Sequence, residues 1–268
     1  MEKITSLNNP GVLKTVKLTH KPAERKKQKL FVAEGIREVS LALQKKVEVV
    51  TIYVCRDFFT EDPSYPIHLD AFEGQITEVS PQVFAKMAYR KDTGGIILVA
   101  KQFNTYLKDV KLPKDPLIVV LESVQKPGNL GGVLRTCDAA GVDAVVVCDP
   151  LTDVFNPNVI RSGLGCLFTR QVAVCTSGEF MEWAKKNNIN MIAASLQTNK
   201  NHFETDLTLA TALVFGTEAE GLSSKWYQNS YVTLKIPMLG KIDSLNVSVS
   251  VSVLVYEAVR QRMLKSRN

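Results

Sequence analysis

Three polar segments of the chain each follow an apolar run and combine glycines with side chains that could bind or orient a substrate. They are ESVQKPGNLGGVLRT (122–136), FGTEAEGLS (215–223) and IPMLGKIDSLN (236–246). A glycine-rich loop before a helix, like the first of these segments, can bind phosphate on its free N–H groups. The candidate side chains are Asn129, Arg135, Glu218, Ser244 and Asn246.

Each segment also has a simpler structural reading. The glycines of 122–136 could form only a tight turn, because they match neither GxGxxG nor the Lys-Ser/Thr of a P-loop. A carboxylate such as Glu218 could merely cap the next helix. The third segment is harder to explain structurally, because Ser244 and Asn246 would stand at the entrance to a buried helix, where polar groups need partners.

The elements that must position these segments form an alternation of strands and helices over the C-terminal part of the chain. Runs such as LIVVL, AVVVC and ALVFG are apolar on both faces, which is typical of central parallel strands covered by helices. The sequence therefore predicts an open parallel α/β sheet, whose ligands bind at loops beyond the carboxyl ends of the strands. The predicted strands are 117–123, 144–148, 171–175, 191–195, 212–216 and 231–237.

The N-terminal part of the chain predicts a smaller α/β unit. A basic helix, three strand-like runs and two further helices alternate up to about residue 100. The segment KQFNTYLKDVKLPKDP is polar, rich in Lys and contains two prolines, so it reads as a linker. We therefore expect an N-terminal domain over 1–100, a linker over 101–115 and a second domain over 116–268.

The stretch SLNVSVSVSVLVYEAVRQR (244–262) fits two structures. Alternating Ser and Val predict a strand, whereas a 4-4-3 spacing of Leu245, Val249, Val253 and Tyr256 fits a helix. No Gly, Pro or Asn interrupts the second half, so we expect one long helix, capped by Asp243 or Ser244 and buried on most sides in its first half.

Composition narrows the class of protein. The 268 residues are 45% hydrophobic and 22% charged, which is ordinary for a globular protein. No apolar run is long enough to cross a bilayer and the first residues resemble no signal peptide, so we expect a soluble, cytoplasmic protein. The 5 cysteines form no CxxC pair and the 3 histidines have no metal-site spacing, so we expect reduced cysteines and no metal.

The net charge of +6 lies entirely within the first 30 residues. Such a block can be only a solvated helix face. Because no aromatics interleave with it, its functional use would be to contact phosphate, which adds affinity without base specificity.

Together, the three segments resemble the motifs of the SpoU (TrmH-type) ribose 2′-O-methyltransferases of the SPOUT superfamily. PGNLGGVLRT resembles the family's first motif, LVFGTEAEGL its second and IPMLGKIDSLNVSVS its third. The segment NPNVIRSGLGCLF between the first two also fits. ITSLNNP and KLFVAEGIREV resemble the substrate-binding domain, similar to ribosomal protein L30e, that many members carry.

The resemblance implies a deep trefoil knot, in which the C-terminal helix passes through the preceding loops. It implies S-adenosylmethionine (AdoMet) as methyl donor and a catalytic role for Arg135, with Asn129, Glu218, Ser244 and Asn246 completing the site. The implied cofactor-binding residues are Leu213, Phe215, Gly216, Ile236, Pro237, Met238, Leu245 and Asn246. The expected RNA-binding residues are Lys14, Lys17, Arg25, Lys26, Lys27 and Arg161.

The resemblance further implies a homodimer and structured RNA as substrate. A separate L30e-like domain favours 23S ribosomal RNA over tRNA. The alternatives are a tRNA ribose methyltransferase and a non-catalytic RNA-binding protein. A nucleotide-dependent enzyme of another class would need a phosphate fingerprint early in the sheet, and none is present.

Overall fold

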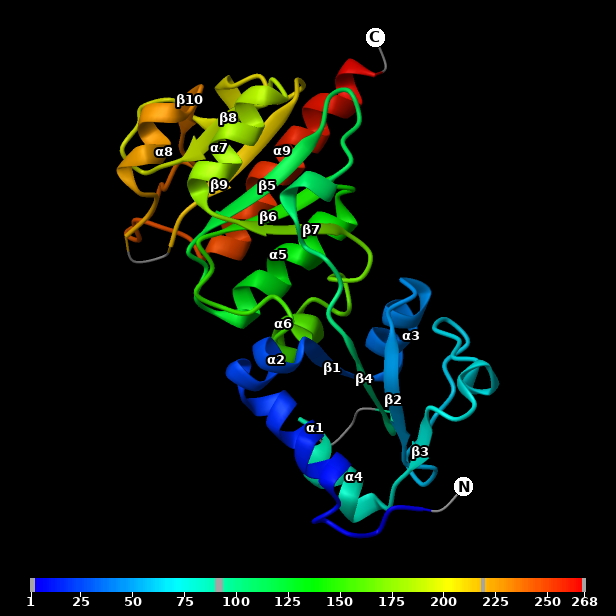
Figure 1. Cartoon of the computed structure of the whole chain (residues 1–268). Helices are drawn as coiled ribbons and strands as arrows, with labels where there is room; N and C mark the ends of the chain where they lie inside the picture. Colours follow the sequence, from blue (N-terminus) through cyan, green and yellow to red (C-terminus); the bar gives the residue numbers. More distant parts are fainter. Residues whose placement is uncertain (1–2, 90–93, 218–219, 267–268) are drawn as a thin grey trace. The chain divides into compact units, whose positions relative to one another are not determined.

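The computed structural model describes residues 3–89, 94–217 and 220–266, and the chain separates into two compact units (Figure 1). The first unit contains the chain up to Asn104 together with Asp153–Thr169. The second contains Thr105–Thr152 and the chain from Arg170 onward. The segment 153–169 thus lies between two strands of the second unit in sequence but is part of the first unit in space.

The first unit is built on a mixed sheet with the strand order β1-β4-β2-β3. Strand β4 is antiparallel to β1 and β2, and the short β3, which the sequence pattern did not predict, is parallel to β2. Its elements are α1 (Pro10–His20), α2 (Pro22–Gln28), β1 (Leu30–Glu34), α3 (Ile36–Gln44), β2 (Val49–Val54), the 3₁₀ turn η1 (Leu69–Phe72), β3 (Ile76–Glu78), α4 (Pro81–Met87), β4 (Ile96–Lys101) and α6 (Pro157–Ser162).

The predicted basic helix is two helices. Pro22 has no N–H group and disfavours helical geometry at the residue before it, and Lys21 is indeed extended, with φ −115° and ψ 106°. Asn9 begins α1 by accepting a hydrogen bond from Gly11 N at 2.9 Å.

Alternate residues of β1 face two different layers. Leu30 and Val32 belong to the core that α1 and α4 cover. Phe31 points the other way and stacks on Phe155, with ring centroids 5.5 Å apart. This period of two follows from strand geometry and assigns 153–169 to the sheet face opposite α1.

The second unit confirms the predicted open parallel sheet. Its strand order is β10-β8-β9-β5-β6-β7, and every neighbouring pair is parallel. Its elements are the 3₁₀ turn η2 (Leu107–Asp109), β5 (Leu117–Glu122), α5 (Pro127–Ala139), β6 (Ala144–Cys148), β7 (Gln171–Cys175), α7 (Ser177–Lys186), β8 (Asn190–Ala194), the 3₁₀ turn η3 (His202–Glu204), β9 (Thr211–Phe215), α8 (Ser224–Asn229), β10 (Val232–Leu234) and α9 (Val247–Lys265).

Helices cover both faces of this sheet. Phe180 of α7 and Trp226 of α8 are fully buried in one core cluster with the strands. Helices α5 and α9 pack together and contact β6 and β9. The chain leaves β5 toward β6 and β7, and later returns to the other side of β5 through β8 and β9. The gap between the loops that leave β5 and β9 is therefore a topological switch point, where open α/β sheets bind ligands.

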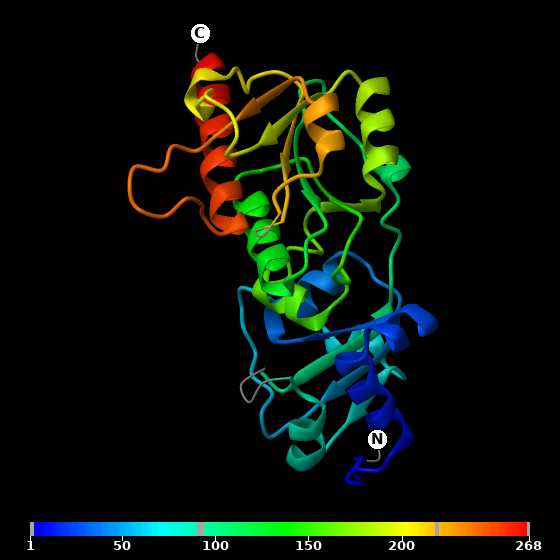
Figure 2. The same cartoon turned by 90° about the vertical axis from the view of Figure 1, so that its left-hand side faces the viewer.

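Residues 247–265 form the expected long helix, α9, but two details of the expectation were wrong. Its N-cap is Asn246, not Asp243 or Ser244. Its first half is less buried than predicted, since Val249 remains 45% exposed and Tyr256 50% exposed. Figure 2 shows the orange loop before α9 extending away from the sheet.

Candidate functional site

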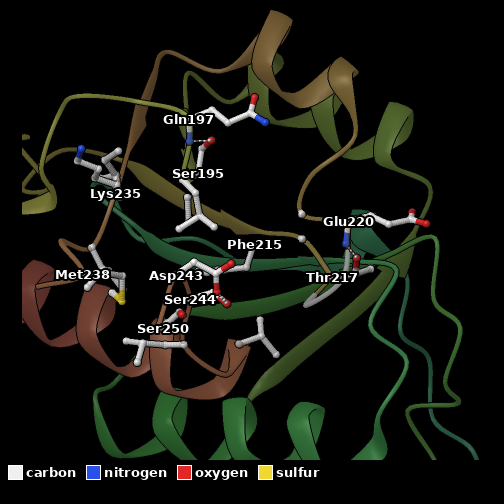
Figure 3. A pocket seen from close by; sticks show the side chains of 18 of the residues that line it. Ser195, Gln197, Phe215, Thr217, Glu220, Lys235, Met238, Asp243, Ser244 and Ser250 are labelled. Atoms are coloured by element: carbon white, nitrogen blue, oxygen red, sulfur yellow. Dashed lines mark hydrogen bonds between the residues drawn. The ribbon is translucent and has the colours of Figure 1, made fainter. Parts of the chain in front are cut away.

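The loops that follow β8, β9 and β10 enclose a cavity of about 300 Å³ (Figure 3). This volume lies at the lower end of the range of small-molecule sites. Apolar lining comes from Phe215, Leu234, Ile236, Met238 and Leu245, and polar lining from Ser195, Gln197, Thr217, Glu220, Asp243 and Ser244. The cavity thus combines an apolar wall with a few polar groups, which is the usual composition of a cofactor site.

A second cavity, of about 240 Å³, opens on the β5 side of the switch point. It is lined by residues 121–126 except Ser123, and by Asn129 of the first motif. Gly216, Thr217 and Val247 line both cavities, so the two spaces meet at the loop after β9.

Gly216 allows that loop to fold back on itself. A Cβ atom at this position would lie 2.1 Å from the backbone of Gly221, far inside any contact distance. Thr217 and Gly221 exchange two backbone hydrogen bonds, each 3.0 Å long, which hold the turn closed. Only glycine can occupy position 216 without displacing the wall of both cavities.

Asn246 joins the third motif to the first. Its Oδ1 accepts a hydrogen bond from Ser248 N at 3.0 Å and thereby caps α9. Its Nδ2 donates to Asn129 Oδ1 at 3.2 Å. Two predicted site residues that are 117 positions apart are therefore in direct contact.

Small residues bring α5 and α9 close together. A Cβ atom on Gly132 would lie 3.2 Å from Ser248 Cβ, and Thr136 Oγ1 lies 2.9 Å from Ser252 Oγ. Ser248 and Ser252 are one turn apart and face α5, whereas Val251 and Val255 are buried. The Ser-Val alternation of this segment is therefore the pattern of a helix whose small face meets another helix.

Arg135 lies on α5 one turn after Gly132, and its side chain is exposed. Within the described residues it makes no hydrogen bond or ion pair and lines neither cavity. Ser244 lines the first cavity and donates to Asp243 Oδ1 at 3.0 Å. Glu218 lies outside the described residues.

The predicted cofactor-binding residues divide into two groups. Phe215, Gly216, Ile236, Met238 and Leu245 line the first cavity. Leu213 does not, because it is fully buried inside β9, where it pairs with Val119 and Ile192. Pro237 and Asn246 also fall outside the described lining.

Sequence reasoning missed the contribution of the loop after β8. Ser195 and Gln197 line the first cavity, and Gln197 N donates to Ser195 Oγ at 3.1 Å (Figure 3). The sequence did predict MIAAS as a strand. The loop after a parallel strand must lie at the carboxyl edge of the sheet with the loops of the three motifs, and this was the one signal for Ser195 and Gln197.

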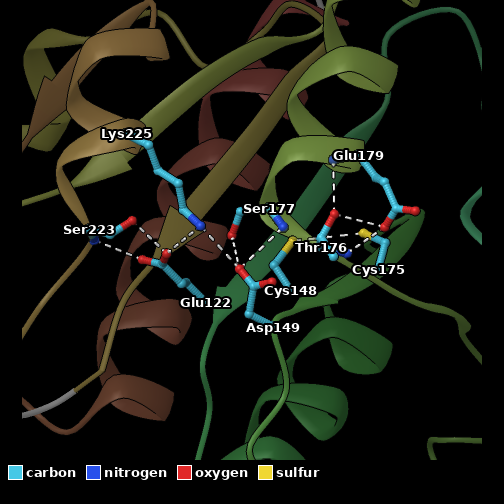
Figure 4. Close-up of polar contacts among 9 residues, drawn as sticks. All are labelled: Glu122, Cys148, Asp149, Cys175, Thr176, Ser177, Glu179, Ser223 and Lys225. Carbon is cyan, nitrogen blue, oxygen red and sulfur yellow. Dashed lines mark hydrogen bonds and ion pairs between the residues drawn. The ribbon is translucent and has the colours of Figure 1, made fainter.

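A polar network ties together the carboxyl ends of β5 and β6 and the start of α8 (Figure 4). Glu122, only 6% exposed, accepts hydrogen bonds from Ser223 N at 2.8 Å and from Ser223 Oγ at 2.7 Å. The Lys225 Nζ atom lies 3.6 Å from Glu122 Oε1 and 3.2 Å from Asp149 Oδ2. Glu122 therefore anchors the end of the loop that separates the two cavities.

Asp149 also holds the start of α7, because its Oδ2 accepts hydrogen bonds from the backbone and hydroxyl of Ser177. Burial opposes ionisation of this carboxyl, but the hydrogen bonds from Ser177 and Lys225 outweigh burial and hold its pKa below the ordinary value.

The cysteines that end β6 and β7 lie opposite each other in the sheet. Cys148 and Cys175 have their sulfur atoms 3.9 Å apart and are both reduced. Their mutual hydrogen bond and the burial of Cys148 raise the pKa of the Cys148 thiol far above its ordinary value, so it carries no thiolate at neutral pH.

The basic first unit presents most, but not all, of its predicted RNA-binding side chains. Lys14, Lys17, Lys26 and Lys27 are exposed. Arg25 is only 1% exposed, and its guanidinium donates to Asp153 Oδ2 and Leu18 O, both at 2.7 Å. The prediction that Arg25 contacts RNA was wrong, because its charge is already used to pin α1 and α2 to the segment 153–169.

Two absences apply to the part of the chain that the structure describes. Across residues 3–89, 94–217 and 220–266, no group of three or more His, Cys, Asp or Glu side chains could hold a metal ion. Among the helices in those ranges, none combines the length and apolar character needed to span a membrane.

Comparison with known proteins identifies both parts of the chain. The model of the SpoU rRNA methylase family matches residues 116–256, and that of an MRM3-like substrate-binding domain matches residues 9–98. The chain is 29% identical over 262 residues to the 23S rRNA (guanosine(2553)-2′-O)-methyltransferase RlmP of Bacillus subtilis, covering 96% of this chain and 98% of that protein.

Solved structures agree. The SpoU methyltransferase AviRb from Streptomyces viridochromogenes in complex with AdoMet is similar with a TM-score of 0.86 and 26% identity, over 96% of this chain and 100% of that one. An AdoMet-bound rRNA methyltransferase from Sinorhizobium meliloti has a TM-score of 0.86 and 26% identity, over 97% of each chain. With the three motifs gathered around one switch point and both family models matched in order, this chain belongs to the SpoU rRNA methylase family.

Proposed function

We propose that this protein transfers a methyl group from AdoMet to a ribose 2′-hydroxyl of 23S ribosomal RNA. The observation that carries the proposal is the pair of cavities that meet at Gly216 and Thr217, lined by loops from all three motifs. One cavity suits a small cofactor with a flat aromatic ring, and the other lies beside Asn129, on the side from which we expect the acceptor nucleotide to approach. With rRNA as its substrate, we expect the protein to act in the cytoplasm.

When bound, AdoMet would supply a methyl group that is electrophilic because it is bonded to a positively charged sulfonium sulfur. The residues present suit such a group. Phe215, Ile236 and Leu245 offer apolar surface for an adenine ring, and Ser195, Gln197 and Glu220 offer polar groups for its ribose and amino acid portions. The chain must then align the acceptor oxygen and accommodate the loss of its proton.

Arg135 is the residue that we assign to the acceptor. A guanidinium is protonated at neutral pH, so it cannot serve as an ordinary base. It can grip the phosphate next to the acceptor ribose and stabilise the alkoxide as it forms, and its exposed side chain has no competing partner within the described residues. Asn129, Asn246 and Ser244 orient the groups around it, and we keep Glu218 in the same role.

We further propose that residues 116–268, apart from the segment 153–169 that is part of the first unit, form the catalytic domain and residues 1–100 the RNA-binding domain. The exposed Lys14, Lys17, Lys26 and Lys27 provide phosphate contacts. Arg161 is assigned to RNA as well.

The catalytic domain is proposed to be knotted and homodimeric. Support for dimerisation comes from apolar side chains left exposed on α9 and the loop before it: Leu239 is 97% exposed, Ile242 64% and Met263 60%. Large apolar side chains left exposed to solvent are a feature of association surfaces.

The test uses ribosomal and transfer RNA from cells that lack this chain, incubated with the purified full-length protein and AdoMet labelled in its methyl group. We expect label to enter 23S rRNA at one nucleotide. Label in tRNA alone would correct the substrate. Absence of transfer to any RNA, with AdoMet bound, would leave a non-catalytic RNA-binding protein.

A further inference from the structure

An aromatic ring completes the basic surface of the first unit. Tyr89 follows α4, and its backbone N–H donates to Glu34 Oε2 at 2.6 Å, which fixes it at the carboxyl end of β1. The His20 ring lies beside it, with ring centroids 6.1 Å apart and planes inclined by 33°. The Arg161 guanidinium lies 5.7 Å from the centre of the same ring.

The three side chains come from α1, the segment after α4, and α6, and Arg161 is half-buried. Tyr89 is 45% exposed, and His20 is exposed as well. A tyrosine held in place only for packing would be buried like Tyr53, which is 5% exposed in the core beneath α1. Tyr89 therefore presents aromatic surface to solvent.

Arg161 forms no ion pair within residues 3–89, 94–217 and 220–266. Its Nη2 donates to the neutral Asn158 side chain, and its Nε is buried with no hydrogen-bond partner within residues 3–89, 94–217 and 220–266. By contrast, the buried Arg25 is paired with Asp153. Arg161 thus keeps its charge available for an anion or for a polarisable ring near Tyr89.

A line of basic side chains leads to this ring. Lys14, Lys17 and His20 follow one another at intervals of three on α1, so they lie along one side of the helix, and all three are exposed. The basic segment has no aromatic residue of its own, but the fold supplies Tyr89 from about 70 positions away. Cationic groups that follow a backbone beside an exposed ring are typical of single-stranded nucleic acid binding.

We propose that Tyr89, flanked by His20 and Arg161, is a stacking site for an unpaired base of the RNA substrate, with Lys14 and Lys17 on the adjacent phosphates. The proposal rests on the proposed function and adds to it. A base inside a duplex is already stacked on its neighbours, so the site selects RNA with a splayed or looped nucleotide.

The test measures fluorescence anisotropy of the full-length protein with two labelled RNA probes of equal charge. One is a hairpin with an unpaired seven-nucleotide loop, and the other is a blunt, fully paired duplex. In the Tyr89→Leu variant we expect hairpin affinity to fall by about 10-fold and duplex affinity to stay within about 2-fold, since base stacking on an aromatic ring has roughly that effect. Tyr89→Phe keeps the ring and should bind both probes as the unmodified protein does.

Tyr65→Leu is the matched control. Tyr65 also lies against an arginine, with the Arg37 guanidinium 4.5 Å from its ring centre, but Arg37 belongs to α3 and not to the basic line on α1. The Tyr65→Leu variant should bind the hairpin as tightly as the unmodified protein does. The AdoMet dissociation constant, measured in the same preparations, shows that the second unit is intact.

Two outcomes would overturn the stacking site alone: Tyr89→Leu binding the hairpin as tightly as the unmodified protein, or losing affinity for hairpin and duplex equally. If the unmodified protein neither methylates rRNA nor binds the hairpin, the proposed function itself has failed. Methylation of rRNA by the unmodified protein separates these cases.

Discussion

The carboxyl edge of the six-stranded sheet and the basic surface of the first unit are both assigned to the RNA substrate, but they are built in different ways. At the sheet edge, most of the residues that line the two cavities lie on loops that directly follow a strand. On the first unit, His20, Tyr89 and Arg161 come from three separate stretches and share no motif.

The difference has a physical cause. Parallel strands held in register bring their carboxyl ends to one edge, so residues just after different strands must become neighbours. On the first unit, neighbours depend on how helices pack on the two faces of a sheet, and no short pattern records that. Sites at strand ends can therefore be found from sequence, whereas surfaces assembled between helices need coordinates.

The largest expected effect at the sheet edge comes from Arg135→Ala. Loss of a group that stabilises charge in the transition state lowers kcat by about 100-fold to 1,000-fold. AdoMet affinity should stay within about 3-fold, because Arg135 does not line the first cavity in the described structure. Single-turnover methyl transfer and calorimetric AdoMet binding measure the two quantities.

Arg170→Ala is the control, because Arg170 precedes β7 at the opposite edge of the sheet and is paired with Asp138 at 3.0 Å. It should methylate at close to the normal rate. An Arg135→Ala protein that kept a third of normal turnover would remove Arg135 from the chemistry.

Gly216→Ala comes next, and it tests whether the shared loop shapes both cavities. A Cβ atom 2.1 Å from the Gly221 backbone cannot be accommodated without moving the loop, and such overpacking costs about 1–3 kcal/mol. We expect AdoMet affinity to fall by about 10-fold and the melting temperature to fall as well. In Gly178→Ala the new methyl group meets nothing within 4 Å, and the melting temperature should hold or rise. Unchanged AdoMet binding in Gly216→Ala would contradict this account of the loop.

A smaller effect is expected from the contact between the first and third motifs. Asn246→Ala removes the cap of α9 and should lower the free energy of unfolding by about 1 kcal/mol. A double-mutant cycle with Asn129→Ala, measured by urea unfolding, should give a coupling of about 0.5 kcal/mol, because Asn246 Nδ2 donates directly to Asn129. Additive single effects would mean that the two motifs touch without stabilising each other.

The sequence predicted the strands of the second unit because their apolar runs are unambiguous. It predicted α9 as well, but not its cap or its exposure. Helix capping depends on where the backbone turns, and Val249 is 45% exposed although its apolar neighbours in the sequence predict burial. Arg25 shows the same limit, since its partner Asp153 lies 128 positions away.

The smallest predicted effect concerns the pH dependence of stability, through the polar network in which Asp149 binds Ser177 and Lys225. The pKa of Asp149 is lowered in the folded protein, so its contribution to stability is present above the ordinary carboxyl pKa of about 4 and is lost as pH falls through the folded-state value. Asp149→Asn should therefore lower the melting temperature slightly at pH 7, and the difference should shrink below about pH 4. A difference that stayed constant down to pH 3 would show that the charge of Asp149 is not what stabilises the network.

The central claim is that the methyl group goes to a ribose oxygen and not to a base. Alkali cleaves RNA through attack of the free 2′-oxygen on the neighbouring phosphate, so a 2′-O-methyl group protects one linkage. After transfer of labelled methyl groups to 23S rRNA by the purified protein and complete alkaline hydrolysis, we predict that the label is recovered in a dinucleotide. Recovery of the label in mononucleotides would show that a base was methylated and would contradict the account.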